Sequence, residues 1–522
     1  MESPPTVPQH RADPLILLIS VFLVAICALI YELVAGAVSS YLLGSSVTQF
    51  SLVIGLFLTS MGIGSFLTRF VRRNLLAVFF GVELAVGLAG GFSAVILFAA
   101  FVYSKAYFAT LVAVVVTVGT LIGMEIPLLL RILRERAADL RVSVSQVMTF
   151  DYAGALLASL AFPFFLAPHL GLLKTSFLFG LMNVAVCWIG LLWFRQALAR
   201  SAAGLWLATL AATFLLLAGF FQSNRLVSAF EDKLYADKVI LATQTPYQRI
   251  VLTRWKDDIR LFLNAKLQFA TPDEYRYHEA LVHPAMSLAA RHERVLILGG
   301  GDGMAAREAL KYPDLREVVL VDIDPEMTRL FRDNDMLASL SGNALRDPRV
   351  RVVNEDAQRF LEETDLFFDV VLSDLPDPND LTIGKLYTIS FYRLLTRRLN
   401  ADGVIAVQAT SPFFARQAYW CIANTLDATP LAGPTSATLT ILPYHANVPS
   451  FGEWGFVLAA PRRLHPEDVK LTVPTRYLTE ETIPSLFRFP ADMARVETEI
   501  NRLDNQALVR YYDAGWQYYF GP

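Results

Sequence analysis

Seven long apolar runs occupy the chain before about residue 225, and they limit what this part can fold into. A helix needs about 20 predominantly apolar residues to cross a bilayer, and each run is near or above that length. The chain of 522 residues is 54% hydrophobic, more apolar than an ordinary soluble protein. We therefore expect residues 1–225 to form an all-α multi-span membrane domain with about seven transmembrane helices in the lipid bilayer. The runs are Pro14–Gly36, Thr48–Phe66, Leu75–Val102, Phe108–Leu130, Ala153–Ala167, Thr175–Phe194 and Ala203–Phe221.

Basic residues between the runs predict how the chain is oriented in a cell (inner) membrane. With the N-terminus inside, the outer loops hold only Lys105 and Lys174. Seven spans then put everything after residue 225 outside the cytoplasm, whereas a substrate made in the cytoplasm would favour the cytoplasmic side. One miscounted span would remove this conflict, and the fifth run is the weakest. The basic residues of the inner loops are Arg11, Arg69, Arg72, Arg73, Arg131, Arg134, Arg136, Arg141, Arg195 and Arg200.

Four acids lie in or at the ends of these runs: Glu32, Glu83, Glu125 and Asp151. A carboxylate inside a membrane is costly, so each is a candidate for a path that carries organic cations or protons. The alternative is that each one caps a helix, bonds a neighbouring hydroxyl or faces the lipid headgroups.

Charge and cysteine content exclude other classes of function. The net charge of -3 argues against nucleic acid as a partner. Cys27, Cys187 and Cys421 have no metal-ligand spacing, so we expect neither a disulfide framework nor a metal site.

The stretch Val295–Pro325, VLILGGGDGMAAREALKYPDLREVVLVDIDP, dominates the second half. An apolar strand leads into the glycine loop Gly299–Gly303, and a helix and a second strand ending in Asp322 and Asp324 follow. Glycines let the backbone turn sharply and approach a ligand, and an acid about twenty residues later suits a ribose diol. This pattern predicts the first βαβ half of a nucleoside-binding sheet, although an ordinary tight turn would also explain the loop.

The aspartate inside the loop, Asp302, restricts the class of ligand that the loop can bind. Its carboxylate repels a phosphate or the carboxylate of S-adenosylmethionine and attracts a cation.

Strands and helices continue to alternate after this unit. We expect strands at Val350–Val353, Phe368–Leu372, Gly403–Gln408 and Phe456–Ala460, the last after a Pro-rich loop, Pro443–Gly455. Residues 286–522 thus read as a C-terminal α/β Rossmann-like (methyltransferase-type) doubly wound sheet. Residues 226–285 read as a linker and a small antiparallel β domain, in which Tyr247–Trp255 and Arg260–Phe269 are the strands, with a helix over Thr271–Met286.

Acids follow two of these later strands. Asp374 and Asp377 lie at the carboxyl edge of the sheet, where doubly wound folds bind ligands. Asp356 is placed either to bond an adenine amino group or to cap the helix that begins at Ala357.

These residues form an ordered set of motifs that resembles the spermidine synthase family of polyamine aminopropyltransferases. The resemblance covers roughly Thr245–Pro490, and the N-terminal half is similar to the multi-span segments of some membrane-bound bacterial members. The motifs are YQ (247–248), DEYRYHE (273–279), GGGDG (299–303), VDIDP (321–325), EDA (355–357), SDLPDP (373–378) and LYTISFY (386–392).

The resemblance implies a transfer of the aminopropyl group from decarboxylated S-adenosylmethionine to a putrescine-like diamine, without a metal or cofactor. The products are a spermidine-like polyamine and methylthioadenosine. Asp374 would be the catalytic base. Gln248, Asp322, Asp356 and Ala357 would hold the methylthioadenosine portion, His278 and Asp302 the amine chains, and Asp377 an amine with Tyr277 nearby.

Two departures from the family pattern leave the acceptor amine open. Val448 stands where members commonly have Tyr, and Leu381 replaces a proline. Two other functions also remain: an S-adenosylmethionine-dependent methyltransferase, and a polyamine transporter or sensor with an idle synthase domain. Oligomeric state stays open, with a homo-oligomer among the alternatives.

Overall fold

The computed structural model describes residues 13–43, 46–104, 106–136, 140–198, 202–433 and 437–520. Three of the loop charges, Arg11, Lys105 and Arg200, lie outside these residues. The chain folds into two compact units, Met1–Val239 and Ile240–Pro522. Because α7 runs to Leu234, the predicted boundary at residue 225 and the predicted connector Ser223–Asp237 fall mostly within a helix.

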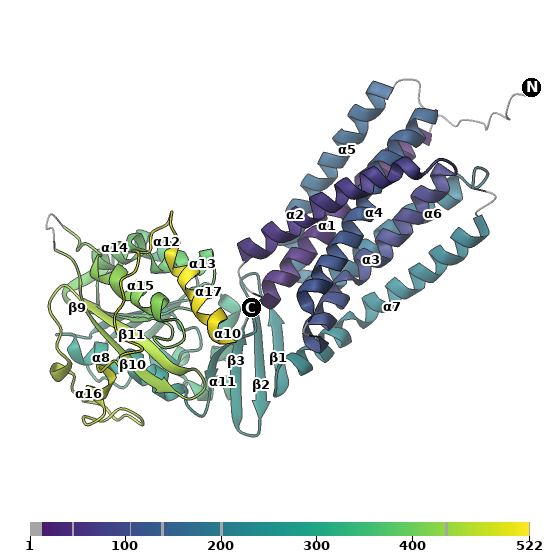
Figure 1. The fold of residues 1–522 in the computed structure, drawn as a ribbon. Coiled ribbons are helices and arrows are strands. Elements are labelled where there is room, and N and C mark those ends of the chain that lie inside the picture. Colours follow the sequence, from purple (N-terminus) through teal and green to yellow (C-terminus); the bar gives the residue numbers. More distant parts are fainter. Residues whose placement is uncertain are drawn as a thin grey trace, which may run out of the picture. The chain divides into compact units, whose positions relative to one another are not determined.

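Long helices make up the first unit (Figure 1). Their bounds are α1 Asp13–Leu43, α2 Ser46–Leu67, α3 Leu75–Tyr103, α4 Tyr107–Arg136, α5 Leu140–Ala161, α6 Gly171–Trp193 and α7 Ala202–Leu234, with a π-helical segment, Phe162–Leu170, between α5 and α6.

Six helical segments among the described residues are long and apolar enough to cross a membrane, where the sequence predicted seven. The predicted fifth and sixth runs are joined in one segment, Val144–Trp193, of 50 residues. Pro163 and Pro168 each remove a backbone donor, and the chain winds into the π-helical segment Phe162–Leu170 after the end of α5.

The chain turns back at Gly171, where φ is +75°. Thr175 Oγ1 lies 3.5 Å from Leu166 O, nine residues earlier, whereas a continuous helix would separate these residues by about 13 Å. Val144–Trp193 therefore holds two helices, α5 and α6, which correspond to the predicted fifth and sixth runs.

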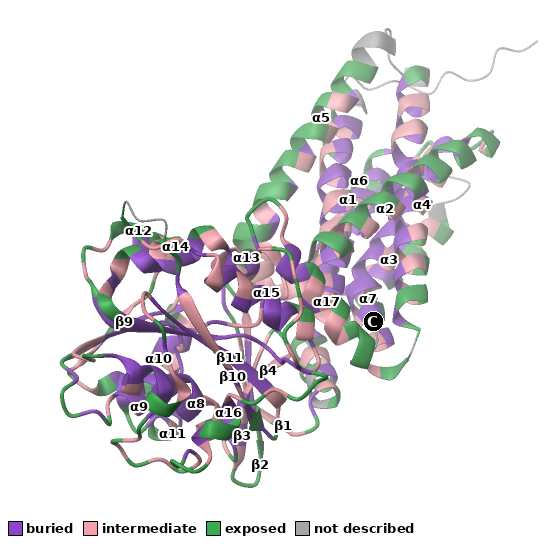
Figure 2. Cartoon of the chain, turned by 60° about the vertical axis from the view of Figure 1, so that its left-hand side comes forward, coloured by how far each residue is buried: buried purple, intermediate pink, exposed green. Residues whose placement is uncertain are grey.

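The outer surface of this unit is apolar. Phe164, Phe214 and Phe221 expose 67%, 72% and 77% of their surface, and Figure 2 shows much of α5 and α7 as exposed. Since contiguous apolar surface is rare on soluble monomers, these helices suit a membrane environment.

The four candidate acids divide into two kinds. Glu83 and Glu125 are buried among the helices, at 0% and 1% exposure, and the amide of Asn183 donates to Glu83 Oε2 at 3.2 Å. Glu32 and Asp151 are only partly buried.

The second unit begins with an antiparallel sheet in the order β1-β2-β3-β4, formed by Lys238–Gln244, Arg249–Trp255, Asp258–Leu263 and Lys266–Ala270. The predicted small β domain is confirmed, but the predicted strand Arg260–Phe269 is two strands. Asn264 and Ala265 take positive φ angles of 49° and 63° and form the turn between them. An Asn-Ala pair is a weaker turn signal than Asn-Gly, which is why the sequence did not reveal it.

A seven-stranded sheet follows, in the order β10-β11-β9-β8-β5-β6-β7. Five strands, β9 to β7 in this order, are parallel, and β11 and β10 are antiparallel. The strands are β5 Arg294–Gly299, β6 Glu317–Val321, β7 Val350–Val353, β8 Phe368–Asp374, β9 Leu399–Gln408, β10 Thr440–Val448 and β11 Gly452–Ala460.

The predicted doubly wound fold is confirmed. Val295 and Ile297 belong to the core on one face of the sheet, and Leu296 and Leu298 belong to the core on the other, as the two-residue period of a strand requires. The predicted loop Pro443–Gly455 was wrong, because most of it belongs to the hairpin of β10 and β11. β10 is an edge strand, and an edge tolerates a proline such as Pro443.

Helices cover both faces of this sheet (Figure 1). They are α8 Glu274–Leu288, α9 Met304–Ala309, α10 Pro325–Asp333, α11 Asp335–Leu340, α12 Ala357–Glu363, α13 Leu381–Gly384, α14 Ile389–Arg398, α15 Arg416–Asp427, α16 Ile483–Leu486 and α17 Ala507–Phe520.

Candidate active site

The glycine loop after β5 brings three strand ends together. Gly299 has a φ of +80°, and a Cβ atom there would lie 2.2 Å from the backbone oxygen of Asp374. A Cβ on Gly301 would lie 2.5 Å from Asp322 Oδ2. Only glycine permits both of these close contacts. The loop therefore lets the ends of β5, β6 and β8 lie against one another.

Asp322 is held by backbone amides at the end of β6. Its Oδ2 accepts from Gly301 N at 3.0 Å, and its Oδ1 accepts from Asp324 N at 2.9 Å. Burial raises the pKa of Asp322 to about 6. Carboxylate lone pairs beyond these two bonds can accept hydroxyl donors of a ribose.

Asp324 orients Gln248, a role that the sequence analysis did not foresee. The carboxylate is fully buried, and its Oδ2 accepts from Thr245 Oγ1 at 2.9 Å and from Gln248 Nε2 at 3.0 Å. The motif VDIDP contained Asp324, but only the fold shows that the small β domain is fastened through it.

Asp356 caps α12, and Ala357 is the first residue of that helix. Asp356 Oδ1 accepts from Gln358 N at 2.9 Å and from Arg359 N at 3.2 Å. Lys385 Nζ donates to its Oδ2 at 2.9 Å. Burial raises the pKa of Asp356, but the bonds from Lys385 and the backbone outweigh it and lower the pKa. The capping interpretation is confirmed, and the adenine interpretation remains a prediction.

Asp374, the last residue of β8, is bonded to Tyr277. The Tyr277 hydroxyl donates to Asp374 Oδ1 at 2.7 Å. Burial raises the pKa of Asp374 to about 6, with the charge of His278 opposing and that of Asp302 adding to the increase. A buried carboxylate with a raised pKa is a stronger base than an exposed aspartate, as proton abstraction requires.

His278 is a buried cation beside these acids. Its Nδ1 lies 2.8 Å from Glu274 Oε2. Burial opposes protonation, but Glu274, Asp302 and Asp374 together raise the pKa of His278 to about 9. Arg307 in turn donates to both oxygens of Glu274, at 3.0 and 2.9 Å.

Asp302 lies inside the glycine loop and is 8% exposed. Its Oδ1 accepts from Met304 N at 2.8 Å. Burial raises the pKa of Asp302, and the charge of His278 counteracts this. The structure therefore brings Asp302, Asp374, Tyr277 and His278 into one electrostatically coupled group.

Asp377 lies three residues beyond Asp374 in the loop between β8 and α13. Its Oδ2 accepts from Thr410 Oγ1 at 3.1 Å, its Oδ1 accepts from Gln408 Nε2 at 3.4 Å, and it also receives a bond from Tyr512. Burial raises the pKa of the Tyr277 hydroxyl, and the negative charges of Asp374 and Asp377 raise it further. Asp377 therefore belongs to the same site.

Sequence reasoning missed several of these residues. Gln408 is the last residue of β9, at the carboxyl edge of the sheet, and this position could have identified it as a site residue from the sequence. Tyr512 lies beyond the stretch that carries the family resemblance, and nothing in the sequence marked it.

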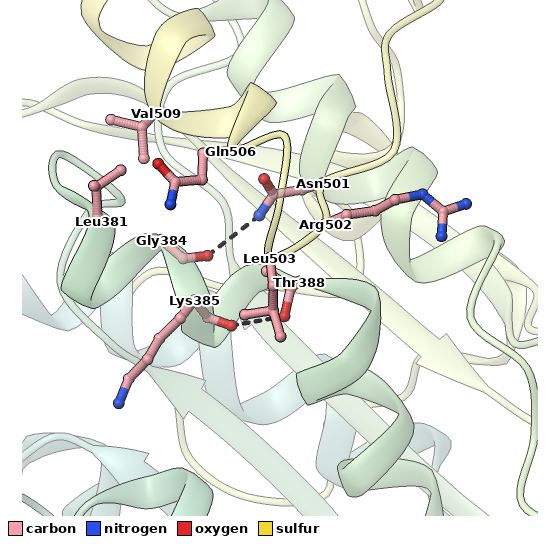
Figure 3. Close-up of a pocket in the computed structure, with 9 residues that line it drawn as sticks. All are labelled: Leu381, Gly384, Lys385, Thr388, Asn501, Arg502, Leu503, Gln506 and Val509. Atoms are coloured by element: carbon pink, nitrogen blue, oxygen red, sulfur yellow. Dashed lines mark hydrogen bonds between the residues drawn. The ribbon is translucent and has the colours of Figure 1, made fainter.

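A small pocket near this site is lined by residues of α13 and the C-terminal segment (Figure 3). Its volume of about 20 Å³ holds roughly one water molecule, so it is not a nucleoside site. Asn501 Nδ2 donates across it to Gly384 O at 3.2 Å, fastening the C-terminal segment to the helix that follows Asp377.

Among the described residues, no group of three or more His, Cys, Asp or Glu side chains is arranged to hold a metal ion.

The chain is similar to known proteins. The spermine/spermidine synthase domain matches residues 274–461. The chain is 50% identical to polyamine aminopropyltransferase 1 of Ralstonia nicotianae, over 98% of this chain and 96% of that protein. It is 47% identical to the polyamine aminopropyltransferase of Leptospira interrogans, over 96% of this chain and 98% of that protein.

A crystal structure of spermidine synthase with the transition state analogue AdoDATO is 26% identical, with a TM-score of 0.44, over 48% of this chain and 85% of that one. The two full-length relatives show that the chain belongs to the spermidine synthase family of polyamine aminopropyltransferases.

Proposed function

We propose that the chain moves the aminopropyl group of decarboxylated S-adenosylmethionine to a diamine, and that Asp374 is the base. The observation that carries the proposal is the buried Asp374 carboxylate, which lies at a strand end against the glycine loop and is bonded to Tyr277. The products are a spermidine-like polyamine and methylthioadenosine.

The donor nucleoside occupies the edge of the sheet at β5, β6 and β7. Asp322 binds the ribose hydroxyls, and Gln248, oriented by Asp324, lies beside the same strand end. Asp356 and Ala357 contact the adenine at the start of α12, where Lys385 already occupies one Asp356 oxygen.

Asp302 and His278 discriminate between donors. The Asp302 carboxylate attracts the free amine of the decarboxylated donor and repels the carboxylate of its parent. His278, which Glu274 keeps protonated, limits the excess negative charge of the site, so Asp302 and Asp374 can ionise together.

The reaction begins when an ammonium group of the acceptor loses a proton to Asp374. Such amines have pKa values of about 10, so the site must stabilise the neutral amine. The nitrogen lone pair attacks the carbon next to the sulfonium, and the carbon–sulfur bond breaks with its electrons going to sulfur. The positive charge of the donor thereby passes to the new amine, and methylthioadenosine leaves neutral. Holding nitrogen, carbon and sulfur in line supplies much of the acceleration.

Asp377 holds the second ammonium group of the acceptor. Its carboxylate accepts bonds from three neutral donors, Thr410, Gln408 and Tyr512, and these bonds leave its negative charge in place for an ammonium group. Val448 and Leu381 depart from the family pattern, and the identity of the acceptor stays a matter for assay.

The first unit anchors the enzyme in the cell membrane as a multi-pass protein, with the catalytic unit on the cytoplasmic side, where adenosyl metabolites are made. In this proposal Met1–Val239 is the membrane unit, and the small β domain and the catalytic domain share Ile240–Pro522. The apolar exposed faces of α5 and α7 support the anchoring role.

Purified full-length protein tests the proposal when it is incubated with a diamine and either decarboxylated or ordinary S-adenosylmethionine. Methylthioadenosine release that needs both the decarboxylated donor and the diamine is the expected result. Methyl transfer from the ordinary donor would instead identify a methyltransferase, and amine binding without turnover would identify a sensor or transporter.

A further inference from the structure

Two residues outside the matched synthase domain stand beside Asp377. Lys266 comes from β4 and Tyr512 from α17, whereas the domain match spans residues 274–461. Lys266 has no role in the reaction described above, and Tyr512 enters it only as a donor to Asp377.

Lys266 is held at the first position of β4 by the tight turn at Asn264 and Ala265. The turn pairs Leu263 with Lys266 across the hairpin, so the lysine has little freedom to move along the sheet. Its ammonium nitrogen lies 5.3 Å from the centre of the Tyr512 ring. Burial lowers the pKa of Lys266, while the charges of Asp377, Asp513 and Asp380 counteract this, in that order of strength.

Tyr512 is 7% exposed and donates to Asp377. α17, which carries it, packs closely on the start of α15, since a Cβ on Gly515 would lie 2.8 Å from Ala415 Cα. The rings of Phe414 and Trp516 lie 5.4 Å apart at the same contact.

The segment that leads into α17 is fastened to the helix after Asp377. Asn501 donates to Gly384 O at 3.2 Å (Figure 3) and to Tyr387 O at 3.1 Å. Its Oδ1 accepts from Leu508 N at 3.3 Å. The helix that carries Tyr512 is therefore held at two places, at the start of α15 and at the helix that follows Asp377.

We propose that Lys266 and Tyr512 close the far end of the acceptor subsite, with Lys266 as a fixed positive charge that selects diamines over longer polyamines. The inference rests on the proposed function, in which Asp377 holds the second ammonium of the acceptor. A diamine ends at Asp377 and meets the Tyr512 hydroxyl. A triamine would carry a third ammonium group toward Lys266. Two like charges that come close together repel strongly in a partly buried site.

The test compares kcat/KM for putrescine with kcat/KM for spermidine in the full-length enzyme. In Lys266→Met we expect the preference for putrescine to fall by about tenfold or more, because the repelling charge is gone. Lys266→Arg keeps the charge and should keep the preference. Lys256→Met is the matched control, since Lys256 is an exposed lysine at the tip of the neighbouring hairpin.

Tyr512→Phe provides a second readout. Losing the hydroxyl should raise the KM for putrescine several-fold while kcat changes less, because the hydroxyl orients Asp377 and lies away from the reacting carbon. A purely structural role would leave KM unchanged and lower the amount of folded enzyme instead.

The inference is overturned if Lys266→Met leaves the preference within about threefold of the parent, or if both acceptors improve equally. A parent enzyme that transfers to no amine would contradict the proposed function itself, so the two failures are distinguishable.

Discussion

At the scale of residues, the site consists of carboxylates whose burial opposes their ionisation. Asp374 and Asp322 both have pKa values raised to about 6 by burial, and the buried His278 cation supplies part of the compensating charge. This balance makes Asp374 basic enough to accept a proton and still ionised at neutral pH.

Replacement of Asp374 by Asn should lower turnover by about a hundredfold or more, the range usual for losing a general base. Nucleoside binding should remain nearly unchanged, because Asn occupies the same volume next to Gly299. Turnover and the Kd for methylthioadenosine are the two measurements, and equal turnover in the variant and the parent would refute the role.

Replacement of Asp302 by Asn should weaken the discrimination against ordinary S-adenosylmethionine. The neutral amide no longer repels the donor carboxylate, so competitive inhibition by the carboxylated compound should become about tenfold tighter relative to the parent. Unchanged relative inhibition would mean that the discrimination arises elsewhere.

The sequence identified Asp302, Asp322, Asp374 and Asp377 because each follows a strand at one edge of a predictable sheet. It could not identify Lys266 or Tyr512. Their part in the site depends on a two-residue turn and on a helix far along the chain, and neither local pattern points to a ligand.

At the scale of elements, the glycine loop and the buried Asp324 hold the nucleoside side of the site together. The sequence predicted the βαβ unit correctly, since apolar strands and glycine turns are local signals. It failed at β10, where pairing with β11 overrides the presence of Pro443.

Gly301→Ala should weaken donor binding about tenfold or more. The new Cβ atom would lie 2.5 Å from Asp322 Oδ2 and would push that carboxylate away from its position. The KM for the donor measures this. Gly55→Ala is the control, since a Cβ there meets nothing within 4 Å. An unchanged KM would show that Asp322 can move without loss of donor binding.

Asp324→Ala should destabilise the catalytic unit by about 3 kcal/mol, because Thr245 and Gln248 lose a buried partner. Thermal unfolding of the catalytic unit measures this. Asp335→Ala, at a side chain that is 93% exposed, should cost less than about 1 kcal/mol. Equal losses in both variants would contradict the fastening role of Asp324.

At the scale of the whole molecule, the described residues before the catalytic unit form seven long helices, α1 to α7. The number of crossings decides the side of the catalytic unit, because an even number returns the chain to the side of its N-terminus and an odd number does not. Composition was sufficient to predict long apolar helices in this part of the chain. It could not predict the π-helical segment Phe162–Leu170 that precedes the turn at Gly171, because its backbone geometry is not specified by a local residue pattern.

With the catalytic unit in the cytoplasm, as proposed, a reporter fused to the C-terminus should be active there. Green fluorescent protein should fluoresce there, and alkaline phosphatase, which needs the periplasm, should remain inactive. Phosphatase activity would instead place the C-terminus outside the cytoplasm and would contradict the proposed location of the catalytic unit.

The dependence of kcat/KM on pH tests the central claim most directly, namely that a buried carboxylate deprotonates a bound ammonium. With Asp374 as the base, kcat/KM should rise to a plateau above about pH 6, following the pKa of Asp374, and should fall again only near the pKa of the amine, about 10. A rate that instead rises tenfold per pH unit up to pH of about 10 would show that the enzyme selects an already neutral amine from solution, and would contradict the account.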